Sequence, residues 1–165
     1  MFSLRNIRSR SITVLLGLII AACAAPAATG PRIRVQDAWA RPGAMGMGHE
    51  MGHGMSHGGE STSAVYFVVV NDGDQPDVLT GAVSDVAERV ELHETRMEGD
   101  VAKMQPVPRV EIPARGRVEF KPRGLHVMLI GLKRDLQVGE TFTLTLQFER
   151  SGEIPVRVSV KEMVP

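Results

Sequence analysis

The sequence predicts an all-β domain, a sandwich or a barrel of about eight or nine strands. Two observations support this fold class. Short segments rich in Val alternate between apolar and polar positions from residue 33 to residue 160, which is the pattern of strands that bury one face. Turn-forming residues interrupt these segments at short intervals, and no long amphipathic helix pattern lies between them.

The expected strands and turns follow one another along the chain. The strands of the first half are residues 33–39, 64–71, 78–84 and 89–95. Those of the second half are residues 117–121, 141–148 and 154–160, together with a strand that carries His126 and Met128. Turn signals occur at residues 71–74, 98–100, 113–116, 138–139 and 151–152. Large apolar residues occupy every second position of the last two strands, which predicts one buried and one wet face.

The N-terminal segment has the pattern of an export signal. Arg5, Arg8 and Arg10 precede an apolar run over residues 12–22, which is too short for a membrane span of about 20 apolar residues. The residues that end this run, 20–23, resemble a bacterial lipobox, in which Cys23 is lipidated and becomes the first mature residue. The alternative is a plain signal peptide cut at Ala22 or Ala25.

This pattern divides the chain into a signal peptide at residues 1–22, a short tether at 23–31 and one domain at 32–165. We expect an exported protein, periplasmic or otherwise extracytoplasmic, that meets the membrane only through a lipid at Cys23. The whole chain has no net charge, but without residues 1–22 its formal net charge is −3, which disfavours a nucleic-acid partner. Because Cys23 is the only cysteine, the domain can hold neither a disulfide nor a thiolate metal site.

Residues 43–59 interrupt the strand pattern with a segment made almost wholly of Gly, Met and His. Its Met and His residues occupy every odd position: Met45, Met47, His49, Met51, His53, Met55 and His57. Thioether sulfur prefers Cu(I), whereas imidazole accepts Cu(I), Cu(II), Zn and Ni, so the mixture indicates copper first, with Cu(II) as a further candidate. The alternative is a solvated low-complexity loop without a metal.

A second group of Met and His residues lies within the predicted strands: His93, Met104, His126 and Met128. His126 and Met128 are two residues apart, so in a strand their side chains share a face. We expect His93 on a separate strand and Met104 near a turn, so that long-range folding has to complete the site. Taken singly, Met128 could be ordinary core and His93 an ordinary strand histidine, but the spacing of all four favours a metal site. Met97 and Met163 fall outside the spacing and are interpreted as packing or surface residues.

The order His, ten residues, Met, twenty-one residues, His, one residue, Met resembles the signature of the PCu(A)C family of periplasmic copper chaperones. Residues 38–42, 64–66, 90–93, 112–114 and 126–132 are also similar to that family, so the resemblance covers nearly the whole mature domain. It implies a cupredoxin-like Greek-key β-sandwich that binds one Cu(I) through His93, Met104, His126 and Met128. It further implies delivery of the copper to the CuA centre in the copper-bearing subunit of cytochrome c oxidase, with a Sco-type thiol reductase or copper chaperone as a further partner.

Two features depart from the family pattern. The family often carries its additional Met and His residues in a C-terminal tail, whereas here the tail ends at Pro165 and the rich segment lies at residues 43–59. The family is also often simply secreted, so a lipid at Cys23 would tether this protein.

Ligand chemistry supports a copper carrier independently of the resemblance. A blue-copper electron carrier needs a Cys thiolate, which the domain lacks, and the absence of carboxylate ligands in the proposed sites disfavours Ca²⁺ and Mg²⁺. A copper-sequestering resistance protein would use the same ligands without a dedicated acceptor. An enzyme is less favoured because no nucleophile–base, paired-carboxylate or phosphate-loop arrangement stands out. A structural adhesion domain would bind no metal through these residues.

Overall fold

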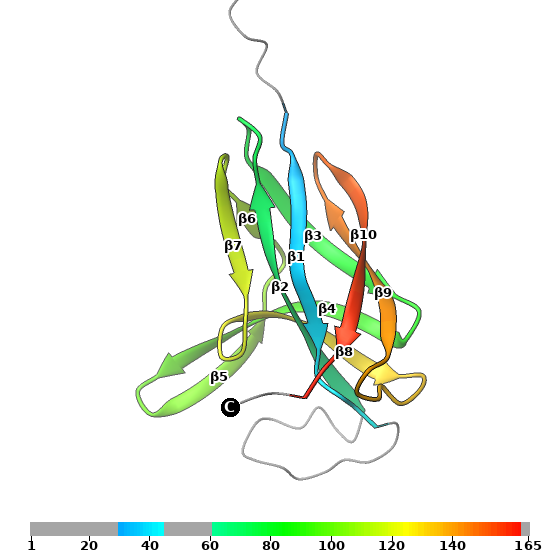
Figure 1. The fold of residues 1–165 in the computed structure, drawn as a ribbon. Helices are drawn as coiled ribbons and strands as arrows, with labels where there is room; N and C mark the ends of the chain where they lie inside the picture. The colour runs from blue at the N-terminus through cyan, green and yellow to red at the C-terminus, as the bar shows by residue number, and fades with distance from the viewer. Residues whose placement is uncertain (1–29, 45–60, 163–165) are drawn as a thin grey trace, which may run out of the picture.

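The computed structural model describes residues 30–44 and 61–162, which form ten β-strands and no helix (Figure 1). The strands are β1 (Ile33–Ala40), β2 (Thr62–Asn71), β3 (Asp77–Ser84), β4 (Ala87–Glu98), β5 (Val101–Pro106), β6 (Val110–Ile112), β7 (Gly116–Phe120), β8 (Leu125–Leu132), β9 (Thr141–Phe148) and β10 (Gly152–Val160). The predicted all-β class is confirmed, with ten strands rather than eight or nine. In the described part of the chain, no helix long and apolar enough to span a membrane is found.

The two strands that the sequence pattern did not predict are β5 and β6. Every residue of β5 is exposed, so no alternation of apolar and polar residues marks it, and β6 has only three residues. Both exist because a neighbour supplies their hydrogen-bond partners, β4 for β5 and β3 for β6. Pairing of this kind depends on tertiary context more than on the residues of the strand itself.

The strands follow one hydrogen-bonded path in the order β5-β4-β8-β2-β1-β10-β9-β3-β6, and β7 pairs with β2. Of these pairs only β1 and β10 run parallel. The path folds over on itself, so that β3 and β6 lie behind β1 and β2 (Figure 1). The hydrophobic core fills the space between these layers.

Strand β2 connects the core to the rest of the sheet. Its first half pairs with β8 and its second half with β7, while its other edge pairs with β1. Val65, Phe67 and Val69 point into the core, where the Phe67 ring stacks on Phe120 with ring centroids 4.4 Å apart. Burying one such aromatic side chain stabilises a fold by about 1.5–3 kcal/mol. The alternate residues of β2, such as Tyr66, therefore lie on the opposite face of the sheet.

Asp77 ties the start of β3 to the turn between β9 and β10. Its buried carboxylate accepts hydrogen bonds from the backbone N–H groups of Val78, Arg150 and Ser151 at 2.8, 3.0 and 3.0 Å, and from the Ser151 hydroxyl at 2.6 Å. Burial raises the pKa of Asp77, but these hydrogen bonds to the ionised form outweigh burial and leave the pKa below its usual value. The carboxylate thus holds together two strands that lie far from the Met and His residues.

Candidate metal centre

The centre of the site is the pairing of β4 with β8. In this antiparallel register His93 stands directly opposite His126, and their ring centroids are 5.9 Å apart. Both side chains are buried, with 2% and 3% of their surface exposed. Two residues separated by 33 positions in the sequence are thus brought side by side by strand pairing alone.

Met128 extends this pair along β8. It stands opposite Glu91, and each of these two residues lies two positions along its strand from the histidine of that strand. Because alternate residues of a strand share a face, Met128, His126, His93 and Glu91 all lie on the same side of the sheet. The neighbouring residues Val127 and Leu92 point into the core on the other side.

Met104 reaches the same face from the other edge of β4. It lies within β5 opposite Thr95, and Pro106 of the same strand stands opposite His93. Met104 is therefore a diagonal neighbour of His93, about 7–8 Å away between backbones and within reach of a long side chain. Met104 lies on the second strand of a hairpin whose turn is at residues 99–100, and this strand, β5, was not predicted from the sequence pattern. Met104 is 39% exposed, in contrast to the other three residues.

Each imidazole has one ring nitrogen engaged by an acceptor. Nε2 of His93 lies 2.9 Å from the Glu91 carboxylate, and Nδ1 of His126 lies 3.0 Å from the carbonyl oxygen of Gly124. These contacts favour a proton on Nε2 of His93 and on Nδ1 of His126. The lone pairs suited to a metal are then those of Nδ1 in His93 and Nε2 in His126. Metal-binding histidines are commonly oriented in this way, by a hydrogen bond from the ring nitrogen that does not bind the metal.

The electrostatics of the site keep His126 neutral. Burial is the main cause of its lowered pKa, and Coulombic repulsion from His93 and Arg41 acts in the same direction, while the hydrogen bond to Gly124 partly opposes it. A neutral imidazole at neutral pH can bind a metal without first losing a proton. Among the described residues no cluster of three or more His, Cys, Asp or Glu able to hold a metal is found, and the side chains beside the two imidazoles on this face include the thioether of Met128.

Two aromatic residues that were not assigned to the site from the sequence, Tyr66 and Trp39, extend in a row from His126. The Tyr66 ring is 6.3 Å from His126, and the Trp39 ring is 4.6 Å from Tyr66, measured between ring centroids. A bulge in β1, where Asp37 has a φ of 52°, shifts the register between Gln36 and Trp39. If the register of Gln36 with Val68 continued unchanged, Trp39 would stand opposite Val65 on the core face, whereas the register shift at the bulge places it opposite Tyr66.

A sequence signal exists for one of the missed partners and not for the others. Glu91 precedes His93 by two residues in a predicted strand, so its place on the same face follows from alternation. Trp39 and Tyr66 could not be found in this way, because their position depends on a bulge and on the pairing of β1, β2 and β8.

The described residues that flank the Met- and His-rich segment lie near the C-terminal end of β8, beyond Met128 along that strand. Gly43 pairs with Leu136, and the Ser61 carbonyl accepts hydrogen bonds from the N–H groups of Gly131 and Leu132 at 3.0 and 3.2 Å. Ala64, three residues beyond Ser61, stands opposite Met128. The predicted loop ligands Met45, Met47, His49, Met51, His53, Met55 and His57 lie outside the described residues, as do Cys23, the predicted signal peptide and Met163.

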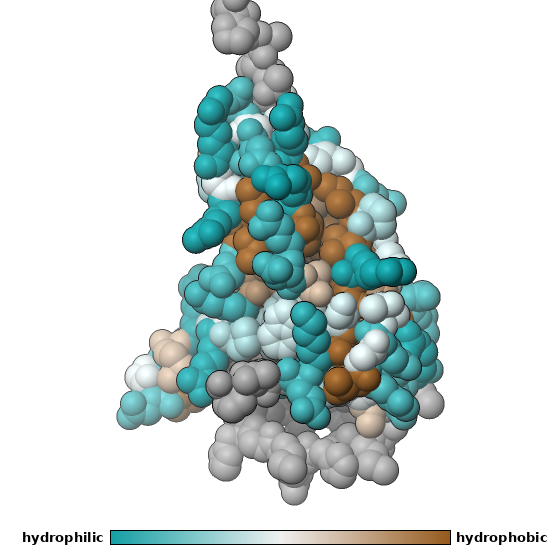
Figure 2. Space-filling model, in the orientation of Figure 1, coloured by the Kyte–Doolittle hydropathy of each residue, from teal (hydrophilic) through white to brown (hydrophobic). Residues whose placement is uncertain are grey.

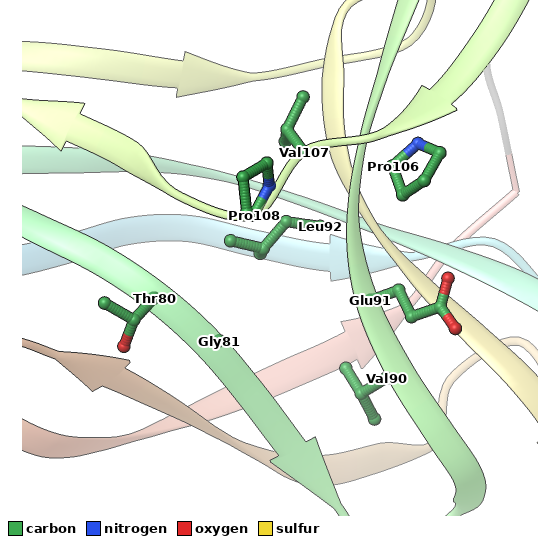
Figure 3. A pocket seen from close by; sticks show the side chains of 8 residues that line it. All are labelled: Thr80, Gly81, Val90, Glu91, Leu92, Pro106, Val107 and Pro108. Atoms are coloured by element: carbon green, nitrogen blue, oxygen red, sulfur yellow. The ribbon is translucent and has the colours of Figure 1, made fainter.

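A cavity of about 360 Å³ lies beside β3 and β4 (Figure 3). Thr80 and Gly81 of β3 line one wall, and Val90 and Leu92 of β4 line another, with the segment 106–108 closing one end. Its lining contains neither sulfur nor imidazole. The Met and His residues therefore do not line this cavity, whereas Glu91, which is hydrogen-bonded to His93, does.

Solved structures with the same fold are copper-binding domains. The copper-bound PCuAC domain from PmoF2 is 25% identical, with a TM-score of 0.57 over 79% of this chain and 93% of that one. The solution structure of CuI-DR1885 from Deinococcus radiodurans is 34% identical, with a TM-score of 0.56 over 79% of this chain and 80% of that one. The fold and the arrangement of the sheet are thus those of PCuAC copper-binding domains.

The family is identified from the sequence itself. Residues 33–160 match the family described as "Putative lipoprotein LpqE-like", and the chain belongs to this family. Among curated relatives, "Putative lipoprotein Lxx21020" of Leifsonia xyli subsp. xyli is 29% identical over 96% of this chain and 91% of its own length. "Uncharacterized protein RP573" of Rickettsia prowazekii is 34% identical over 74% of this chain and 62% of its own length.

Proposed function

We propose that this protein is a copper chaperone of the PCu(A)C type that binds one Cu(I) through His93, Met104, His126 and Met128. The proposal rests on the strand register, in which two imidazoles and two methionines share one face of β5, β4 and β8. The copper-bound state of the PmoF2 domain and the CuI state of DR1885, as their descriptions give them, support copper as the cargo.

The donor set explains the preference for Cu(I). Two thioethers and two neutral imidazoles carry no charge, and thioether sulfur is a soft ligand. Burial raises the pKa of Tyr66, and the positive charge of Arg41 partly opposes that rise. The same charge adds to the lowering of the pKa of His126, which burial mainly causes, so a positive charge lies near the site. Such a charge disfavours a divalent ion more than a monovalent one. Glu91 acts on His93 through a hydrogen bond and is not counted among the ligands.

We further propose that the loop at residues 43–59 captures copper, including Cu(II), and supplies it to the domain site. Seven alternating Met and His residues motivate this role. The attachment points of the loop at Gly43 and Ser61 lie beside the strand that carries Met128, which keeps captured copper near the site. Deleting residues 46–58 should lower the copper bound per protein while leaving one Cu(I), and an unchanged total would contradict the role of the loop.

The cellular setting completes the proposal. An export signal ending at Cys23 and a family described as lipoproteins support an extracytoplasmic protein anchored by a lipid at Cys23. In that compartment we propose the copper-bearing subunit of cytochrome c oxidase as the acceptor for its CuA centre, with a Sco-type thiol reductase or copper chaperone acting on the same acceptor. No catalytic step is assigned to the protein itself.

A transfer experiment tests this function. The mature protein, loaded with one equivalent of Cu(I), is mixed anaerobically with the copper-free soluble domain of the oxidase subunit, and the copper content of each is measured after separation. Copper should move to the acceptor from the wild type, whereas His126→Ala should transfer little, because any Cu(I) that it retains is held by the loop at residues 43–59. The control Val101→Leu changes an exposed residue on the other face of the β4–β5 hairpin and should behave like the wild type.

The same experiment distinguishes the nearest alternative. A copper-sequestering protein would load Cu(I) through the same residues but leave the acceptor empty. Loading that is identical in the wild type and in His126→Ala would contradict the site itself. An adhesion domain predicts this last result.

A further inference from the structure

The β4–β5 hairpin has two faces of different chemistry. One face carries only uncharged residues: Thr95 and Met97 of β4 and Ala102 and Met104 of β5. The other carries charged residues, with ion pairs between Glu94 and Arg96 and between Glu98 and Lys103. The outer part of this hairpin projects from the rest of the molecule, where side chains of intermediate hydropathy lie beside strongly hydrophilic ones (Figures 1 and 2).

Met97, which does not belong to the His and Met spacing, lies on the uncharged face. It stands opposite Ala102, two residues along β5 from Met104, so Met97 and Met104 are diagonal neighbours. Met104 is in turn a diagonal neighbour of His93, which is paired directly with His126. The five residues Met97, Met104, His93, His126 and Met128 therefore form an unbroken row of potential soft-metal ligands.

Accessibility falls steeply along this row. Met97 is 62% exposed and Met104 is 39% exposed, whereas His93 and His126 are 2% and 3% exposed. Apolar side chains as exposed as Met97 are uncommon among the described residues, and the hairpin also carries Val101 at 61%. The sulfur atoms of Met97 and Met104 are therefore more accessible to an incoming ion than the buried imidazoles are.

We propose that Met97 and Met104 form an outer loading site for a soft monovalent cation, Cu(I), from which the ion passes to His93, His126 and Met128. This inference rests on the proposed function, because it specifies how copper reaches the same site. The methionine pair holds the ion only transiently. Met104 then stays bound to the ion while His93 replaces Met97.

Each step is a ligand exchange without a change of oxidation state. In each exchange a bond from Cu(I) to a new sulfur or nitrogen ligand forms while the bond to the ligand that it replaces breaks. The first ligand replaced belongs to the molecule that delivers the copper, and the ion remains Cu(I) throughout. The hairpin part of this face suits the exchange because it carries no carboxylate that would attract hard cations. The carboxylate on the same side of the sheet, that of Glu91, lies beyond the hairpin and is hydrogen-bonded to His93. The carboxylates of Glu94 and Glu98 lie on the opposite face, where they are already paired.

Loading kinetics test the proposal in the full mature chain. Copper-free protein is mixed with a coloured Cu(I)–bicinchoninate complex, and the loss of colour is followed by stopped flow. Met97→Leu preserves side-chain volume but removes sulfur. We expect it to load about tenfold more slowly, equivalent to about 1.4 kcal/mol in the barrier, with the final amount and affinity of bound Cu(I) unchanged. A loading rate equal to that of the wild type would overturn the proposal.

The matched control moves the sulfur to the other face of the same hairpin. Val101 is 61% exposed, pairs with Glu98 and lies on the charged face, so Met97→Leu combined with Val101→Met keeps an exposed methionine at the same tip. This double variant should load as slowly as Met97→Leu. Restored loading would show that any exposed sulfur suffices, and would overturn the role of the row.

Methyl NMR with Ag(I) as the probe locates the ion directly. The methyl resonances of Met104 and Met128 should shift with the first equivalent of Ag(I), and that of Met97 should broaden in exchange with it. A Met97 resonance that does not respond would contradict the outer site. Failure of the proposed function would give a different result. The methyl resonances of Met104 and Met128 would then not shift with Ag(I), either in the wild type or in Met97→Leu.

Discussion

The inner and outer parts of the Met and His row differ in how firmly the fold holds them. His93, His126 and Met128 are 2%, 3% and 7% exposed and belong to strands with partners on both edges. Met104 lies in β5, an edge strand in which every residue is exposed. Burial and pairing on both sides fix side chains, whereas an exposed edge opens at lower free energy. The fold thus combines a rigid inner half with an accessible outer half in one candidate site.

The largest effect is expected from His126→Ala at the inner end. Outer partners of metal ligands already contribute about 10–100-fold to affinity, and loss of a direct ligand should exceed that range. We expect Cu(I) affinity, measured by competition with a chromophoric chelator, to fall by more than about a hundredfold. Circular dichroism should confirm that the fold persists. Affinity within about tenfold of the wild type would mean that the inner half is not the principal site.

The second effect separates copper binding from stability. Asp77→Ala removes the acceptor of hydrogen bonds from Val78, Arg150 and Ser151 and should lower the free energy of unfolding by about 3 kcal/mol. Urea unfolding measures this loss. Copper affinity should stay unchanged under native conditions, since Asp77 is remote from the Met and His face. A parallel fall in affinity would show that the two regions are coupled.

A matched pair of methionine variants compares the two halves directly. Met104→Leu and Met128→Leu make the same volume-conserving change, one at an exposed position and one at a buried position. We expect Met104→Leu to weaken Cu(I) binding by about tenfold, or about 1.4 kcal/mol, and Met128→Leu to weaken it more. A larger loss of Cu(I) affinity in Met104→Leu than in Met128→Leu, measured by competition with a chelator, would contradict this prediction.

The smallest effect is that of pH near neutrality. Because the pKa of His126 is lowered mainly by burial, the imidazole stays neutral below the pH at which an exposed histidine is half protonated, about 6.5. Cu(I) affinity should therefore change little from pH 8 to 6.5 and weaken toward pH 5. A constant affinity down to pH 5 would contradict histidine ligation.

The same lowered pKa has a consequence for the copper-free fold. The unfolded chain binds a proton at His126 more readily than the folded chain does, so the folded state loses stability as pH falls below about 6.5. Chemical denaturation of the copper-free protein at pH 7.5 and pH 5.5 measures this change. His126→Gln should reduce the pH dependence, since it removes the titrating group.

Much of the fold could be predicted because alternation is local. The last two strands show it at every second residue, and both were predicted with bounds close to those observed for β9 and β10. The prediction missed β5, the strand that carries Met104, because the residues of β5 are exposed on both faces. No local pattern marks a strand whose stability comes from its partner.

The candidate site was predictable as a set of residues but not as a geometry. Spacing in the sequence singled out His93, Met104, His126 and Met128, because Met and His are the soft and borderline ligands of a domain without cysteine. The sequence also predicted that His126 and Met128 share a face, because the alternation of side chains along a strand is a property of the backbone.

Tertiary structure alone decided the rest. Strand register places His93 opposite His126 and brings Met97 next to Met104. The bulge in β1 determines how Trp39 and Tyr66 lie beside one another. A shift of one residue in any of these pairs would turn the side chains to the opposite face. The sequence by itself therefore determined the class of fold and the kind of ligand, while strand pairing between distant segments determined which ligands meet.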